Sequence, residues 1–238
     1  MHSSSPTDTL RGTLRDLLAS HADNAALERL LADYARFHLV LVVVAGLFLL
    51  ALLALSAGCW RRYFLTRRSA APSGTFERRV WGGFGLLSAG VASFLGLVVA
   101  ANLSNVRDPR HGFAGALGLL GTPSPGSRRA ALQASFDTWL AGGTGELPSP
   151  VVRAIDDRLA WQAPKAVVCS VLLVLLVAAS VLLWRALLAR SRTPEAGPLR
   201  AWAALGLLPV AAAAVVMLMV MGNTQASLAP LAMTLFYG

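Results

Sequence analysis

Residues 39–60 read LVLVVVAGLFLLALLALSAGCW, and residues 61–68 continue as RRYFLTRR. The first stretch has no charged residue, whereas the second has four arginines. An α-helix of about 20 apolar residues is long enough to cross the roughly 30 Å hydrocarbon layer of a bilayer. This part of the sequence therefore predicts a membrane-spanning helix that ends at a block of positive charge.

Three further windows contain no charged residue, at 80–106, 166–184 and 201–238. The whole chain is 55% hydrophobic and 14% charged, whereas a soluble domain has about 25% charged residues. A backbone in lipid must satisfy its own hydrogen bonds, so each window is expected to be helical. We therefore predict an all-α integral membrane protein, a four-transmembrane-helix bundle with N-terminal extramembrane helices and a two-helix outer loop.

The charge-free windows divide the chain into nine expected segments. In order, these are extramembrane N-terminal helices at 1–37, a transmembrane helix at 38–60, a basic cytoplasmic loop at 61–79, a transmembrane helix at 80–103, an outer loop at 104–164, a transmembrane helix at 165–184, a basic cytoplasmic loop at 185–200, a transmembrane helix at 201–222 and an apolar C-terminal segment at 223–238.

Arginine is concentrated in the two short loops. Residues 61–79 contain six Arg and one acidic residue, and residues 185–200 contain four Arg and one acidic residue. Loops of this kind stay in the cytoplasm, so both termini and the 104–164 loop are expected outside, in the plasma (inner) membrane of a bacterium. The expected topology anchors, which would also contact anionic inner-leaflet lipids, are Arg61, Arg62, Arg67, Arg68, Arg78 and Arg79.

Two export signals overlap the first anchor but do not fit their context. LSAGC at 55–59 resembles a lipoprotein cleavage box, yet Ser56 stands where such a box has an aliphatic residue. RRYFL at 61–65 resembles a twin-arginine motif, yet fourteen residues separate it from the next apolar window. We interpret the stretch as a charge anchor. A module that could present it to nucleic acid is not visible, so nucleic acid is not an expected partner.

Periodic leucines predict helices before the first window. Residues 10–18 place leucines on one helical face, and this short helix is expected either to pack on its neighbour or to lie on the membrane surface. Asp23 or Asn24 fits as the N-cap of one long helix from about Ala25 to Ala57.

Two helices are expected in the outer loop, from Ser127 to Leu140 and from Ser149 to Trp161. On the second helix, Val152, Ile155 and Leu159 are expected to face inward, with Arg153 and Asp157 paired at i, i+4. The C-terminal segment contains Pro230 and is expected to dock on this two-helix cap as an interfacial or re-entrant segment.

Small residues recur every four positions in the second window, a spacing that lets helix backbones approach closely in lipid. This face would serve packing within the bundle or self-association, and the sequence does not separate the two. Its members are Gly85, Ser88, Ala89, Ala92, Ser93, Gly96 and Ala100. Polar amides gather near the outer ends of the second and fourth expected transmembrane helices, where they would line a vestibule or satisfy helix ends. These are Asn102, Asn105, Asn223 and Gln225.

No motif predicts a catalytic, cofactor or metal site. Cys59 and Cys169 are expected on opposite sides of the membrane as free thiols. His21, His38 and His111 are expected to have separate roles rather than to converge on a metal.

Three function classes fit these features. The chain is expected to be a non-catalytic subunit or regulator of a bacterial envelope or transport complex, either as a homo-oligomer or with another membrane protein. The first alternative is a homo-oligomeric channel. The second is a membrane enzyme acting on lipid-linked substrates through Asp156, Asp157 and His111, although arginines beside the carboxylates more simply neutralise them.

Overall fold

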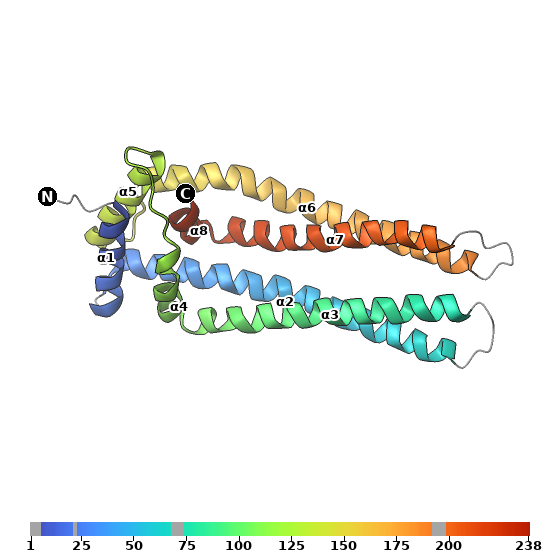
Figure 1. Cartoon of the computed structure of the whole chain (residues 1–238). Coiled ribbons are helices and arrows are strands. Elements are labelled where there is room, and N and C mark those ends of the chain that lie inside the picture. Colours follow the sequence, from blue (N-terminus) through green and yellow to red (C-terminus); the bar gives the residue numbers. More distant parts are fainter. Residues whose placement is uncertain (1–5, 21–22, 68–73, 192–198) are drawn as a thin grey trace. The chain divides into compact units, whose positions relative to one another are not determined.

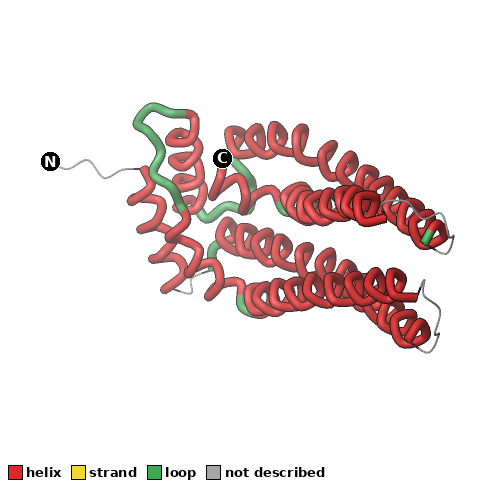
Figure 2. The backbone as a smooth tube through the Cα atoms, turned by 45° about the vertical axis from the view of Figure 1, so that its right-hand side comes forward, coloured by secondary structure: helices red, strands yellow, loops and turns green. Residues whose placement is uncertain are grey.

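The structure is a computed structural model that describes residues 6–20, 23–67, 74–191 and 199–238. All regular secondary structure in these ranges is helical, with loops between the helices (Figure 2). In chain order the helices are α1 (Pro6–Ser20), α2 (Ala25–Arg67), α3 (Gly74–Arg107), α4 (Pro109–Ala116), the 3-10 helix η1 (Leu117–Leu119), α5 (Arg128–Gly142), α6 (Ser149–Arg190), α7 (Leu199–Leu228) and α8 (Pro230–Tyr237).

Four of these helices are long and apolar enough to cross a membrane, namely α2, α3, α6 and α7. Their side chains within the charge-free windows remain largely uncovered by protein, including Leu97, which is 71% exposed. Exposed leucine and valine side chains along a whole helix are stable against lipid but costly against water. The expectation of an all-helical chain is confirmed for the described residues, and so is that of four helices long and apolar enough to span a membrane.

The chain divides into two compact units. The head unit comprises Met1–Val42, Ala100–Pro164 and Gly222–Gly238, and the span unit comprises Val43–Val99 and Lys165–Met221. Helices α2, α3, α6 and α7 each contribute residues to both units (Figure 1).

The head unit has its own hydrophobic core. Helix α1 packs mainly on α5 and also contacts α4, whereas the sequence was interpreted as packing it on the long helix that follows. The periodic leucines before the first window and the aromatic face of α5 are buried, and α8 completes the core. The core residues are Leu10, Leu14, Ala26, Leu27, Leu30, Leu31, Tyr34, Phe113, Leu117, Leu120, Leu132, Phe136, Trp139, Leu140, Val151, Leu231, Ala232, Leu235 and Phe236.

Asn24 determines where α2 begins. Its Oδ1 accepts a hydrogen bond from the backbone N–H of Leu27 at 2.8 Å, which caps the helix, and its Nδ2 donates to the Leu140 carbonyl at 2.8 Å. One side chain therefore satisfies an otherwise unpaired N–H at the start of α2 and a carbonyl near the end of α5. Of the two cap candidates in the sequence, Asn24 has this role.

The second helix expected in the outer loop is not a separate element. Helix α6 starts at Ser149, as predicted, but continues through Pro164 to Arg190. Two expectations within it are wrong. Val152 is exposed while Val151 is fully buried, although Ile155 packs against the head-unit core as expected. Asp157 pairs with Arg128 on α5 instead of with Arg153, because the packing of α5 brings a competing guanidinium within reach.

The second half of the chain repeats the helix order of the first. Helices α1 and α5 each have 15 residues, α2 and α6 have 43 and 42, α3 and α7 have 34 and 30, and α4 and α8 have 8 each. Each half thus reads as a short helix, two long antiparallel helices and a final short helix that begins with proline. This is the pattern of a four-helix unit repeated in tandem.

Equivalent positions of the two halves also have the same residue types. When α2 and α6 are aligned from their first residues without a gap, several polar and aromatic residues coincide. The matched pairs are Arg29 with Arg153, Asp33 with Asp157, Ser56 with Ser180, Trp60 with Trp184 and Arg61 with Arg185. Aligning α3 with α7 on their glycines Gly85 and Gly206 adds Arg79 with Arg200, Trp81 with Trp202, Asn102 with Asn223 and Pro109 with Pro230.

The repeated Trp and Gly residues meet in both halves of the span unit. A Cβ atom at Gly85 would lie 3.2 Å from the Trp60 indole, and one at Gly206 would lie 3.2 Å from the Trp184 indole. The carbonyl of Gly85 accepts a hydrogen bond from Ser56 at 3.0 Å, and that of Gly206 accepts one from Trp184 Nε1 at 3.1 Å. Absence of a side chain lets each indole lie against the facing backbone, which is how small residues stabilise helix pairs in lipid.

We expect Gly85→Leu and Gly206→Leu each to destabilise the protein by about 1–3 kcal/mol, because the added side chain would displace a packed indole. The matched control is Gly83→Leu, since a Cβ at Gly83 meets no atom within 4 Å. Thermal unfolding in detergent, followed by far-UV circular dichroism, should show lowered midpoints for the first two variants only. Equal midpoints for all three would contradict the close indole contact.

Replacing the α2 cap tests the head unit separately. Asn24→Ala should cost about 1–2 kcal/mol from the lost cap, plus a smaller penalty for removing one of two donors to the Leu140 carbonyl, which also accepts from the Gly143 N–H. Asn24→Asp keeps the capping acceptor and should fall between Asn24→Ala and the unmodified chain. The exposed neighbour Asp23 provides the control Asp23→Ala. Amide hydrogen exchange at Leu27 reports the cap directly, and unchanged exchange in Asn24→Ala would show that the cap contributes nothing.

Candidate functional site

The predicted topology anchors lie at the loop ends of α2 and α3. Arg61, Arg62 and Arg67 are exposed, as is Arg79, whereas Arg78 is half-buried. Arg68 lies outside the described residues. Trp60 makes an edge contact with Tyr63 and stacks on Phe64, so the arginines stand beside a cluster of aromatic rings. This is the residue combination that membrane–water interfaces favour.

The small-residue face of α3 is split between covered and uncovered positions. Gly85, Ser88 and Ala92 are buried within the span unit, and Ala89 and Gly96 are half-buried. Ser93 and Ala100 are exposed.

Three of the predicted vestibule amides form specific contacts in the head unit. Asn102 Oδ1 lies 2.6 Å from His38 Nδ1, whose ring packs edge-on against Tyr34. Buried Gln225 donates from Nε2 to the Phe37 carbonyl at 3.1 Å. The Asn105 side chain lies against the Gly112 backbone, so a Cβ atom at Gly112 would clash with Asn105 Oδ1.

Asn223, the fourth amide, is half-buried on α7. The contact of Asn102 joins α3 to α2, that of Gln225 joins α7 to α2, and that of Asn105 joins α3 to α4. These amides therefore hold helices together within the head unit.

The residues proposed for acid–base chemistry do not meet. Asp156 and His111 are exposed, on α6 and α4, and Asp157 forms an exposed ion pair with Arg128. Within the described ranges, no group of three or more His, Cys, Asp or Glu side chains lies close enough to hold a metal ion. Cys59 and Cys169 are both buried free thiols of the span unit, and His21 lies outside the described residues.

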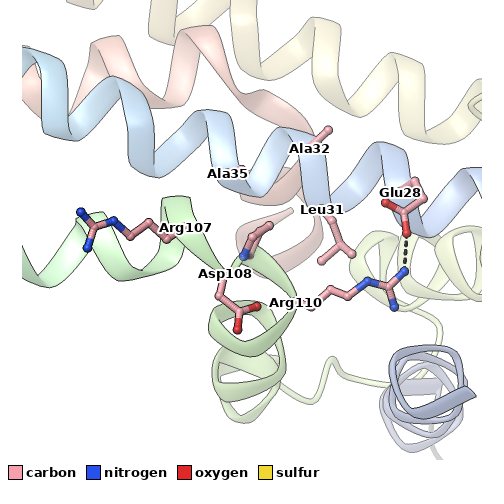
Figure 3. A pocket seen from close by; sticks show the side chains of 8 residues that line it. Glu28, Leu31, Ala32, Ala35, Arg107, Asp108 and Arg110 are labelled. Atoms are coloured by element: carbon pink, nitrogen blue, oxygen red, sulfur yellow. Dashed lines mark hydrogen bonds and ion pairs between the residues drawn. The ribbon is translucent and has the colours of Figure 1, made fainter. Parts of the chain in front are cut away.

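A groove of about 310 Å³ lies where α3 turns into α4, beside the first turns of α2. Sequence patterns did not indicate it, because its residues come from two segments far apart in the chain. Its lining residues are Glu28, Leu31, Ala32, Ala35, Arg107, Asp108, Pro109 and Arg110. The apolar wall is formed by the α2 residues that follow Glu28, and the charged rim is formed mainly by the α3–α4 corner (Figure 3).

The charged side chains of the groove come from α2 and from the α3–α4 corner, and two of them form an ion pair. Arg110 forms an ion pair with Glu28, with 32% and 58% of their side chains exposed. Arg107 extends in the opposite direction, and Asp108 lies between the two arginines (Figure 3). Asp108 Oδ1 accepts a hydrogen bond from the His111 N–H at 3.0 Å and so caps α4. Both Arg107 and Asp108 are exposed, and among the described residues neither forms an ion pair.

The groove can bind a small polar group but offers no obvious reaction. Its lining includes residues of both charges, and the Arg107 and Asp108 side chains leave the α3–α4 corner in different directions (Figure 3). A nucleophile positioned by a neighbouring base is not among its lining residues.

Comparison with known proteins does not assign the chain to a family. The sequence matches no model of a known protein family. Searches of curated proteins and of solved structures likewise give no match.

Proposed function

We propose that this chain is a non-catalytic four-span membrane subunit that organises or regulates a complex by binding another membrane protein. The observation that carries the proposal is the use of polar side chains in the head unit. They make structural hydrogen bonds to backbone carbonyls instead of converging on a reactive centre.

Three arginines support this interpretation. Arg11 donates to the Leu120 carbonyl, Arg29 to that of Gly145 at 2.6 Å, and Arg129 to that of Phe236 at 2.6 Å. Each bond ties a helix to a loop or to a helix end whose carbonyl lacks a partner within its own helix. Arginines that bond to backbone carbonyls in this way hold the surface of the head unit in one conformation. A protein that binds a partner through that surface requires this.

Buried polar contacts between α1 and α5 support it further. Thr7 is fully buried and donates to Gln133 Oε1 at 2.8 Å, while Gln133 donates to the Gly121 carbonyl at 3.0 Å. Thr13 donates to Asp137 at 2.6 Å. Buried polar networks whose members are paired favour one packing arrangement, so the head unit would present a defined surface to a partner.

The uncovered side of α3 is the proposed contact within the membrane. Ser93 and Ala100, two helical turns apart, remain exposed there, and small residues on one side of a helix let a facing helix approach closely. A second membrane protein that supplied a complementary helix would complete the packing that α3 begins within the span unit.

The proposal predicts a mixed assembly. Full-length protein, extracted from its native membrane in mild detergent and measured by mass photometry, should have a mass above that of its 25.0 kDa chain and should contain a second polypeptide. A monomer would contradict the proposal. A symmetric homo-oligomer that conducts ions in liposomes would replace it with a channel.

A substitution on the uncovered side of α3 separates specific association from detergent effects. Ser93→Phe should dissociate the assembly, because the ring would block close approach of a facing helix, while thermal unfolding of the chain alone stays unchanged. Ser170→Phe places the same ring at an exposed serine of α6 and should leave the assembly intact. Loss of the partner in both variants would count against α3 as the contact.

A further inference from the structure

The two repeated halves stabilise the start of their last short helix in different ways. In α4 the cap residue Asp108 is exposed, and its own side chain accepts a hydrogen bond from the His111 N–H. The equivalent residue before α8 is Ala229, which is fully buried and makes no side-chain cap. A carboxylate in place of Ala229 would be desolvated, and the acceptor comes from another helix instead. Asp33 on α2 accepts from the Ala232 N–H at 2.8 Å.

Docking of α8 closes the head-unit core. Leu235 and Phe236 are buried, and the Phe236 ring lies 5.7 Å from that of Phe113. Near the other end of α8, the Phe236 carbonyl accepts from Arg129 at 2.6 Å. A helix of eight residues is not stable in water by itself, so α8 keeps its place through these contacts and through the cap from Asp33.

The surroundings of Asp33 disfavour its charge. Asp33 is half-buried and precedes the charge-free window of α2. Burial raises the pKa of Asp33 and outweighs the groups that lower it, which are the Ala232 N–H, Arg36, the Leu231 N–H and Arg29. Both arginines lie on the same helix as Asp33, and neither α8 nor the end of α7 before it has a charged side chain.

The direction of a pH effect follows from this raised pKa. A carboxyl group whose pKa is higher while α8 is docked binds its proton more tightly in the docked state. Docking is therefore most favourable below the ordinary aspartate pKa of 3.8. It weakens as the pH rises through the higher pKa of docked Asp33, because burial has removed part of the water that an ionised carboxylate needs.

We propose that α8 closes the head unit in a pH-dependent way, docked most firmly when Asp33 is protonated and released more readily when Asp33 is ionised. The protonated carboxyl group still has an oxygen that accepts from the Ala232 N–H, so the cap persists without the charge. Release of α8 uncovers the ring of Phe113 and the neighbouring core, which form an apolar surface on the head unit.

Hydrogen exchange of α8 as a function of pH tests the proposal. The full-length protein is measured in detergent by mass spectrometry on the peptide that covers α8, and each rate is divided by the intrinsic rate of the same amides at that pH. We expect the protection of α8 to fall about threefold or more between about pH 4 and about pH 8, while the protection of α5 stays constant. Protection of α8 that rises with pH, or that does not change, would overturn the proposal.

Two variants separate the charge of Asp33 from its hydrogen bond. Asp33→Asn keeps an accepting oxygen but cannot ionise, so the protection of α8 should not depend on pH and should at least equal that of the unmodified chain at neutral pH. Asp33→Ala removes the acceptor and should lower the protection about tenfold at every pH, the usual effect of losing a helix cap. Asp16→Asn, the same change at an exposed position of α1, is the control and should keep the unmodified pH dependence.

Two other results would each show that the proposal is wrong. If α8 is less protected in Asp33→Asn than in the unmodified chain at neutral pH, the ionised carboxylate strengthens docking. If Asp33→Asn keeps the pH dependence, another group titrates. The profile of the unmodified chain needs no substitution, so it decides the question even where a variant fails to fold. The measurement uses the purified chain alone and does not depend on whether the protein has a partner.

Discussion

Hydrocarbon accepts no hydrogen bonds, and this single constraint accounts for most of the architecture. A segment that enters lipid must form every backbone hydrogen bond within itself, so the four apolar windows belong to long unbroken helices. Even Pro164, which removes one N–H and crowds the preceding turn, does not interrupt α6. Because α2 and α6 begin well before their apolar windows, the same helices also contribute core residues to the head unit.

The head unit solves the opposite problem, since several helix ends meet there and leave backbone groups unpaired. Side chains supply the missing partners. Asn24 serves α2 and α5 together, Arg129 reaches the end of α8, and Asp33 accepts from the Ala232 N–H at 2.8 Å near the start of α8. Apolar burial by residues such as Phe113 and Phe136 provides the driving force, while these polar contacts determine which helix ends lie together. In the head unit, Asn, Arg and Asp side chains thus pair with backbone groups and stabilise the fold.

The sequence was informative where a feature depends on neighbours along the chain. Charge-free windows indicated the spans, helical spacing indicated the leucine face of α1, and Asn24 carried the signal of a helix cap. Features that depend on neighbours in space were missed or wrong. Asp157 pairs across to α5 rather than along α6, and the groove unites residues near Glu28 with residues near Asp108. The repeat is hard to recognise in the sequence because the two halves share few identical residues. In addition, the offset between equivalent positions differs between the α2–α6 pair and the α3–α7 pair. Only the helix lengths of the structure made the match of Trp60 with Trp184 evident.

The number of spans in each repeated half has a topological consequence. A unit with two crossings returns the chain to the side from which it started, so a tandem copy enters the bilayer in the same sense as the original. Because the number of spans is even, the second copy would insert in the same orientation as the first. A copy of a unit with one or three spans would instead insert in the opposite orientation. The two equivalent corners also show that this framework accepts different residues, since the start of α8 is apolar where the start of α4 has Arg107 and Asp108.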